Sequence, residues 1–196
     1  MRAAAWHPVT APSMEPLTVD ELKGHLRISA NDEDALIEAY ALAARSWCEE
    51  YLGRALITQT WQAWYGAWPR DGVLDLPRPP LQSVTWVRWT DEAGVQQTLS
   101  TAVYRVVTAS EPGRIVLAPG AGWPSETLDA GLPIVVQFVC GYGAAEAVPA
   151  GAMQAMRWLV GHMMENREAV TMAALSPQQV PMTARWALDP HRFRYG

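Results

Sequence analysis

The chain has 196 residues and a formal net charge of −5, with 49% hydrophobic and 18% charged residues. This composition excludes a disordered chain and argues against a general nucleic-acid binder. Two cysteines, Cys48 and Cys140, cannot form a disulfide framework, so a reducing compartment is expected. No stretch approaches the roughly 18 apolar residues of a membrane span, and the first residues lack the apolar core of a signal peptide. We therefore expect a soluble, cytoplasmic protein without a membrane partner.

The chain opens with a segment that shows no periodicity. Residues 1–16 contain three prolines, which predicts an N-terminal arm that is flexible or draped over another surface. Thr18 and Glu21 then have the spacing of a capping box, in which each side chain satisfies a backbone N–H of the other residue. This motif predicts a short helix over residues 18–28.

A second helix is predicted to follow, and residues 17–55 form the first part of an expected helical core. Asn31 is expected to cap this helix, and Gly53 is a natural residue to end it. Its apolar face is wide, which favours burial on more than one side, either in a bundle or between subunits. The candidate core or subunit-contact residues on it are Tyr40, Trp47 and Tyr51.

Residues 56–143 show the alternation that is typical of strands. Turn signals rich in proline and glycine separate the strand-like segments. The pattern predicts an antiparallel β module inserted into the helical core. The predicted strands are residues 57–65, 73–76, 84–89, 95–99, 103–107, 114–117 and 134–140.

The last part of the chain predicts a third helix and a tail. Pro149 is suited to the first position of a helix that runs to about Arg167, and residues 144–170 form the second part of the helical core. Residues 171–196 contain three prolines and end in arginine and aromatic residues, so we expect an extended C-terminal arm that becomes ordered on a partner. The fold class is therefore α+β. The candidate interface residues of the arm are Arg185, Trp186, Arg192, Phe193, Arg194 and Tyr195.

The residues do not converge on a catalytic or metal site. His162 and Glu165 form an H-x-x-E pair without the second histidine that a zinc-protease helix carries. We therefore expect no catalytic residue, no metal and no cofactor, and interpret the chain as a non-enzyme.

Ten tryptophans beside two phenylalanines leave one alternative open, a module that binds sugars or nucleobases by stacking. Trp61 and Trp64 differ in strand parity, as do Trp86 and Trp89, so neither pair shares one face of a regular strand. This spacing favours tryptophans in the core or in protein contacts over a flat platform.

Several motifs in a fixed order resemble one known family. They include the helix that ends at glycine and runs directly into a Thr/Gln/Trp strand, Y-L-G-R-A-L-I-T-Q-T-W. The chain resembles the phage head–tail connector (adaptor) family, which also occurs in prophages and gene transfer agents. The resemblance covers roughly residues 15–170. It rests on residues 16–27, 32–37, 51–61, 79–84, 141–143 and 160–168.

The resemblance implies a ring, usually of twelve copies, that binds under the portal protein and extends the DNA channel. A stopper, head-completion or tail protein would bind on the other side, and DNA would pass without specific binding. Assembly would take place in the cytoplasm of a bacterial host, and the mature location would be the neck of the particle. A head-completion or stopper role in the same machine is the alternative. The six arm residues would contact the portal, and removal of residues from about 178 onward should abolish attachment while leaving the domain folded.

Overall fold

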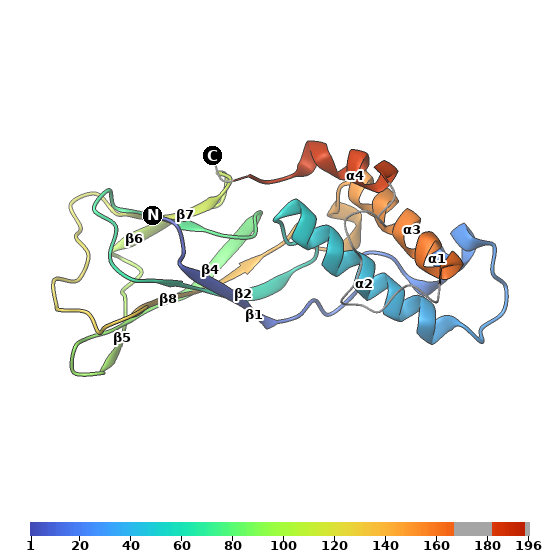
Figure 1. Ribbon diagram of the computed structural model, residues 1–196. Helices are drawn as coiled ribbons and strands as arrows, with labels where there is room; N and C mark the ends of the chain where they lie inside the picture. The colour runs from blue at the N-terminus through green and yellow to red at the C-terminus, as the bar shows by residue number, and fades with distance from the viewer. Residues whose placement is uncertain (167–181, 195–196) are drawn as a thin grey trace. The chain divides into compact units, whose positions relative to one another are not determined.

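The computed structural model describes residues 1–166 and 182–194. Two compact units are each built from segments that are far apart in the sequence. The β unit comprises residues 1–13 and 58–141, and the helical unit comprises residues 14–57 and 142–196. Helices and antiparallel sheets together confirm the α+β class (Figure 1).

The larger sheet of the β unit has five strands in the order β1-β2-β8-β4-β5, and every neighbouring pair is antiparallel. Along β2 and β8, buried residues alternate with half-buried ones, so one face is packed and the other is partly open. The strands are β1 (Ala5–Thr10), β2 (Gln59–Tyr65), β8 (Ile134–Cys140), β4 (Leu81–Thr90) and β5 (Gln96–Thr98).

A three-stranded sheet packs on the buried face of the larger one. Its order is β3 (Val73–Leu76), β7 (Gly113–Leu117), β6 (Tyr104–Val107). The Tyr65 hydroxyl donates a hydrogen bond to the Asp75 carbonyl oxygen at 2.8 Å. A Cβ atom at Gly113 would overlap the side chain of Leu81, so the close approach of the two sheets requires glycine there.

Each of the seven predicted strands is present, with ends that move by a few residues. The largest change is in β4, which is longer than predicted and has two register shifts against β8. The shift between Val84 and Trp86 adds one residue, so Val84 and Val87 share the inner face although they differ in parity.

Residues 1–16 were expected to form a flexible or draped arm, and the structure shows part of this arm as an ordered strand. Residues Ala5–Thr10 form β1 on the edge of the larger sheet, paired with β2 (Figure 1). All six of its side chains are exposed, so no apolar periodicity marks it as a strand. Its anchoring comes from backbone pairing with β2, which a side-chain pattern does not reveal.

The helical unit contains α1 (Val19–Leu26), α2 (Asp34–Leu52), α3 (Ala150–Glu165) and α4 (Met182–Leu188), with short 3-10 turns η1 (Ala145–Ala147) and η3 (Asp189–His191). Its core is formed by buried apolar side chains from the four α-helices of the described residues, including Leu22, Ile37, Met156, Val160 and Leu188. Across the residues that the structure describes, every helix is too short or too polar to cross a bilayer.

The predicted helix ends are largely correct. Thr18 and Glu21 form the expected capping box, and the backbone N–H of Thr18 lowers the pKa of Glu21. Gly53 ends α2 in the left-handed conformation with φ 66°. Asn31 does not cap α2, which begins at Asp34. Its side chain instead accepts a hydrogen bond from Lys23 Nζ.

Candidate interaction surfaces

The C-terminal segment is part of the helical unit and is not an extended arm where the structure describes it. Ala184 and Leu188 of α4 are fully buried in the helical core. A Cβ atom at Gly151 of α3 would lie 2.7 Å from the Ala187 carbonyl oxygen, so α3 approaches α4 through a glycine. The prolines of this region had indicated an extended chain, but the apolar spacing of Ala184 and Leu188 is that of one helix face.

Specific bonds continue past α4. The Tyr51 hydroxyl donates to Asp189 Oδ1 at 2.7 Å, and Arg54 Nε donates to the His191 carbonyl oxygen at 2.6 Å. The Phe193 backbone N–H donates to the Leu52 carbonyl oxygen at 2.8 Å. Removal of residues from 178 onward would strip these bonds and part of the core, so we now expect the truncation to destabilise the domain as well as to abolish attachment.

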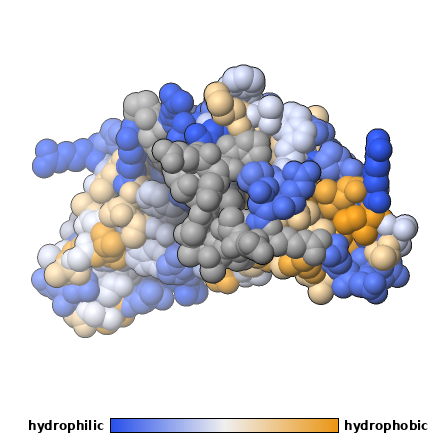
Figure 2. All heavy atoms as spheres, turned by 45° about the vertical axis from the view of Figure 1, so that its right-hand side comes forward, coloured by the Kyte–Doolittle hydropathy of each residue, from blue (hydrophilic) through white to orange (hydrophobic). Residues whose placement is uncertain are grey.

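The candidate residues of this segment differ in how much surface they offer. Trp186 is 65% exposed, and its neighbour on the same helix face, Met182, is 66% exposed. Arg192 and Arg194 are exposed, whereas Arg185 and Phe193 are half-buried. Tyr195 lies outside the described residues. Figure 2 shows hydrophobic residues gathered in patches among hydrophilic ones on one face of the molecule.

The three aromatic residues of α2 have different surroundings. Tyr40 is 8% exposed and belongs to the core. Trp47 and Tyr51 are half-buried and stack on each other with ring centroids 5.1 Å apart. Arg192 lies over the Tyr51 ring at 4.7 Å. Tyr51 thus contacts the C-terminal segment of its own chain.

A buried ion network, which sequence analysis missed, joins the start of the helical unit to α2. Arg45 Nε donates to Glu15 at 2.7 Å and Arg45 Nη1 donates to Glu49 at 2.8 Å. Glu49 Oε1 also accepts the backbone N–H of Leu56 at 2.8 Å. Burial would lower the pKa of Arg45, but the two carboxylates raise it, so the guanidinium stays charged. The i,i+4 spacing of Arg45 and Glu49 was the available signal, but nothing in the sequence pointed to Glu15.

Within each pair, the tryptophans of the larger sheet lie on opposite faces, as their odd and even positions along the strand predicted. Trp61 and Trp89 are buried on the inner face, whereas Trp64 and Trp86 are half-buried on the outer face. The hydrogen-bonded pair Gln62–Gln137 lies between the two outer rings. The rings therefore do not form one continuous stacking platform.

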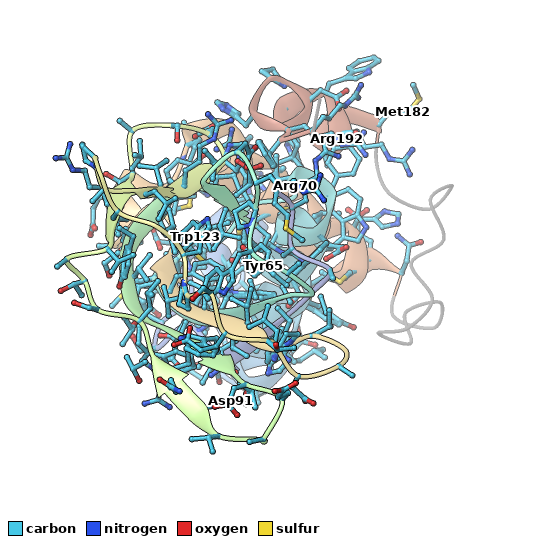
Figure 3. The ribbon with its side chains drawn as sticks, turned by 90° about the vertical axis from the view of Figure 1, so that its left-hand side faces the viewer. Tyr65, Arg70, Asp91, Trp123, Met182 and Arg192 are labelled. Carbon is cyan, nitrogen blue, oxygen red and sulfur yellow. The ribbon has the colours of Figure 1, made fainter. Side chains whose placement is uncertain are left out.

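A second tryptophan pair fixes a long loop. Trp68 and Trp123 stack with centroids 4.7 Å apart, and Trp123 Nε1 donates to the Pro69 carbonyl oxygen at 3.1 Å. Figure 3 shows Trp123 and Tyr65 away from Asp91, which lies at the end of the β4–β5 hairpin. This stack fixes the loop that follows β7 and contributes to the fold of the β unit.

Reactive groups are scattered rather than gathered. Within residues 1–166 and 182–194, no three His, Cys, Asp or Glu side chains are grouped so that they could hold a metal ion. Cys48 is fully buried, and burial raises the pKa of its thiol, so it is held as an unreactive thiol. His162 is half-buried on α3 and lies beside Asn166.

Comparison with known proteins links this geometry to one kind of assembly. Residues 16–112, about half of the chain, match the family model of phage gp6-like head–tail connector proteins. Among curated protein sequences, none matches the chain significantly.

Three solved structures that the chain resembles come from gene transfer agent (GTA) particles. A chain in the neck of an empty GTA particle with C6 symmetry is 26% identical, with a TM-score of 0.78 over 98% of this chain and 97% of the other. A chain in the virion of the native particle is 27% identical, with a TM-score of 0.76 over 97% and 96% of the two chains. The neck of the native particle with C12 symmetry gives 26% identity and a TM-score of 0.76 over 98% and 97%. The chain belongs to the family of phage head–tail connector proteins.

Proposed function

We propose that this protein is a structural head–tail adaptor, a ring subunit in the neck of a phage-like particle such as a gene transfer agent. The observation that carries the proposal is the likeness over 98% of the chain to a neck subunit, joined to the family match. Its action is mechanical: assembly, sealing and passage of DNA, with no catalytic step. The ring forms from copies of this chain made in the cytoplasm of a bacterial host.

The ring attaches to the portal protein through the exposed part of the C-terminal segment. Trp186 and Met182 present two large apolar side chains one helical turn apart, and Arg192 and Arg194 add positive charge. Tryptophan and arginine are the residues that most often dominate protein interfaces. The complementary surface on the portal is therefore apolar with an acidic rim. Arg185, Phe193 and Tyr195 complete the proposed contact.

The opposite side of the ring receives a stopper, head-completion or tail protein, and the channel passes DNA without gripping it. The net charge of −5 suits this role, because carboxylates repel DNA phosphates. A stopper role for this chain would place it one ring away from the portal. Direct contact with the portal separates the two roles.

The test is portal binding by the purified full chain. Trp186→Ala should weaken binding by about 30-fold, because it removes an exposed anchor of the contact. Val106→Ala, at an exposed apolar side chain of β6, is the control and should bind as the wild type does. Equal binding by wild type and Trp186→Ala would contradict the proposed contact. Images of particles that place the chain outside the neck would overturn the adaptor role itself.

A further inference from the structure

The larger sheet of the β unit ends in two strands that have a neighbour on one side only. Among the described residues, β1 pairs with β2 alone, and β5 pairs with β4 alone. All six side chains of β1 and all three of β5 are exposed. The strand order puts β1 and β5 on opposite edges of the same sheet.

These two edges carry no charged side chain to prevent pairing with other chains, and their remaining protection is Pro8, the register shift beside it in β1 and the three-residue length of β5. Natural edge strands carry charged side chains or proline, because unpaired backbone groups are a template for another strand. The sequences of β1 (AWHPVT) and β5 (QQT) contain no Lys, Arg, Asp or Glu, and Pro8 is the one protective residue in them. The edges of the three-stranded sheet differ, since β3 carries Asp75 and β6 carries Arg105.

Exposed apolar side chains accompany the same edges. Trp6 and Val9 of β1 are 44% and 47% exposed, and Val95, directly before β5, is 54% exposed. Large apolar side chains along an open edge are normally an aggregation hazard. Their retention on both edges of one sheet is explained if the assembled protein covers them.

Backbone bonds show which groups of β5 point to the open side. The Leu99 N–H donates to the Val87 carbonyl oxygen at 2.8 Å, and the Asp91 N–H donates to the Val95 carbonyl oxygen at 3.1 Å. Antiparallel pairing alternates with a period of two residues, so Gln97 faces β4 in the same way. The N–H and C=O groups of Gln96 and Thr98 therefore point away from β4.

We propose that β5 of one copy pairs with β1 of the next copy, so that the five-stranded sheets join into one sheet around the ring. The inference rests on the ring of the proposed function and adds which surfaces close it. Five antiparallel strands leave the two edge strands running in the same direction, so copies related by rotation meet through a parallel β5–β1 pair. Such a head-to-tail contact is heterologous and can close into a ring, which removes both free edges at once.

A second copy of this chain is the occupant that the two edges fit best. Both edges are uncharged, both belong to one sheet and both run in one direction, so each copy supplies the two halves of the contact. Backbone hydrogen bonds give the contact its strength, and the flanking apolar side chains of Trp6, Val9 and Val95 add burial.

The sharpest test removes one outward N–H of β5. Thr98→Pro deletes that donor at an edge position where proline is tolerated, and Thr98→Ala changes the same side chain but keeps the donor. Each variant replaces the natural chain in cells that make the particle, and the copies of the chain per purified particle are counted by quantitative immunoblot. We expect Thr98→Pro to lower the copy number about tenfold, while Thr98→Ala stays within about twofold of the wild type.

A second pair of variants tests the β1 edge. Trp6→Lys puts a charge on that edge, which natural proteins use to prevent pairing. Val106→Lys makes the same kind of change on β6, at a side chain that is 37% exposed in the other sheet. We expect Trp6→Lys to lower the copy number about tenfold and Val106→Lys to leave it within about twofold. Purified variants must keep the unfolding midpoint of the wild type, which separates lost assembly from lost folding.

Wild-type copy numbers with both Thr98→Pro and Trp6→Lys would overturn the edge-to-edge contact. So would a neck map in which β5 and β1 of adjacent copies are much farther apart than the roughly 4.8 Å of paired strands, or in which another protein occupies either edge. Those results leave the adaptor role intact. Absence of the wild-type chain from the neck would instead overturn the proposed function.

Discussion

The N-terminal strand is held mainly through backbone pairing, whereas the C-terminal segment is held mainly through side chains. Strand β1 has six exposed side chains and is anchored by pairing with β2. Helix α4 and the residues after it bury Leu188 and make specific bonds through Tyr51 and Arg54. Both ends had been expected to be arms because of their prolines and weak periodicity. The N-terminal arm was predicted to be flexible or draped, and the C-terminal arm was predicted to become ordered on a partner.

The difference shows that an exposed segment and a free segment are not the same thing. Residues of β1 contribute little to the core, yet their backbone groups complete one side of β2. The C-terminal segment offers a large exposed surface at Trp186 only because Leu188, on the same helix, fixes that surface to the core. Mutations that separate backbone from side-chain anchoring should therefore act differently at the two ends.

Truncation of Leu188 to alanine should have the largest effect. The side chain is fully buried, and deleting buried methyl groups leaves a cavity, so we expect a loss of about 3 kcal/mol in the free energy of unfolding. Chemical denaturation monitored by circular dichroism measures it. Trp186→Ala on the same helix should change the free energy by less than about 0.5 kcal/mol. Equal effects of the two variants would show that α4 is not docked through Leu188.

Removal of residues 2–10 should have the next largest effect. Loss of β1 leaves β2 as an unpaired edge, and several backbone hydrogen bonds at about 0.5–1.5 kcal/mol each predict a loss of about 2 kcal/mol. The control is Trp6→Ala combined with Val9→Ala, which keeps the backbone and should cost far less. If the double variant matched the deletion, side chains and not backbone pairing would anchor this end.

Substitution of Tyr51 by phenylalanine tests one side-chain bond of the C-terminal end. The hydroxyl donates to the exposed Asp189, so its loss should cost about 1 kcal/mol near neutral pH. Burial, followed by the bond to Asp189, raises the pKa of Tyr51 above its usual value of about 10. The hydrogen bond of the neutral phenol therefore contributes fully to the free energy of unfolding below pH 10. This contribution is lost as the pH rises through the raised pKa of Tyr51.

Unfolding measured for wild type and Tyr51→Phe at several pH values checks this sign. The stability difference between the two proteins should be constant from pH 7 to 9 and should shrink above about pH 10. A stability difference between the two proteins that grows as the pH rises above 10 would contradict the assignment of Tyr51 as the donor.

Replacement of His7 by alanine should have the smallest effect. The imidazole packs on the Trp64 ring with centroids 4.3 Å apart. An exposed ring pair of this kind is worth about 0.5 kcal/mol, so the thermal midpoint should fall only slightly. A loss as large as that from removing residues 2–10 would place the anchoring of β1 in this side chain.

Much of the fold could be predicted from local patterns. The seven strands after residue 56, the capping box at Thr18 and the end of α2 at Gly53 depend on neighbouring residues, which the sequence displays directly. The parity of Trp61 and Trp64 correctly put them on opposite faces. The interface residues were harder to predict. The sequence identified Trp186 as a candidate because it is a tryptophan, but it did not reveal that the helix around it docks on the core.

Local sequence patterns by themselves predicted the seven strands after residue 56 and the helices α1, α2 and α3, and ordered motifs gave the resemblance to the connector family. Only the tertiary structure decided where residues 5–10 and 182–193 bind, which carboxylate meets Arg45, and which strands remain at the sheet edges. The physical reason is the separation along the chain between the residues that interact. Local propensity acts within one or two turns, whereas these contacts join residues about 30 to 140 positions apart, where the chain pattern carries no signal of the partner.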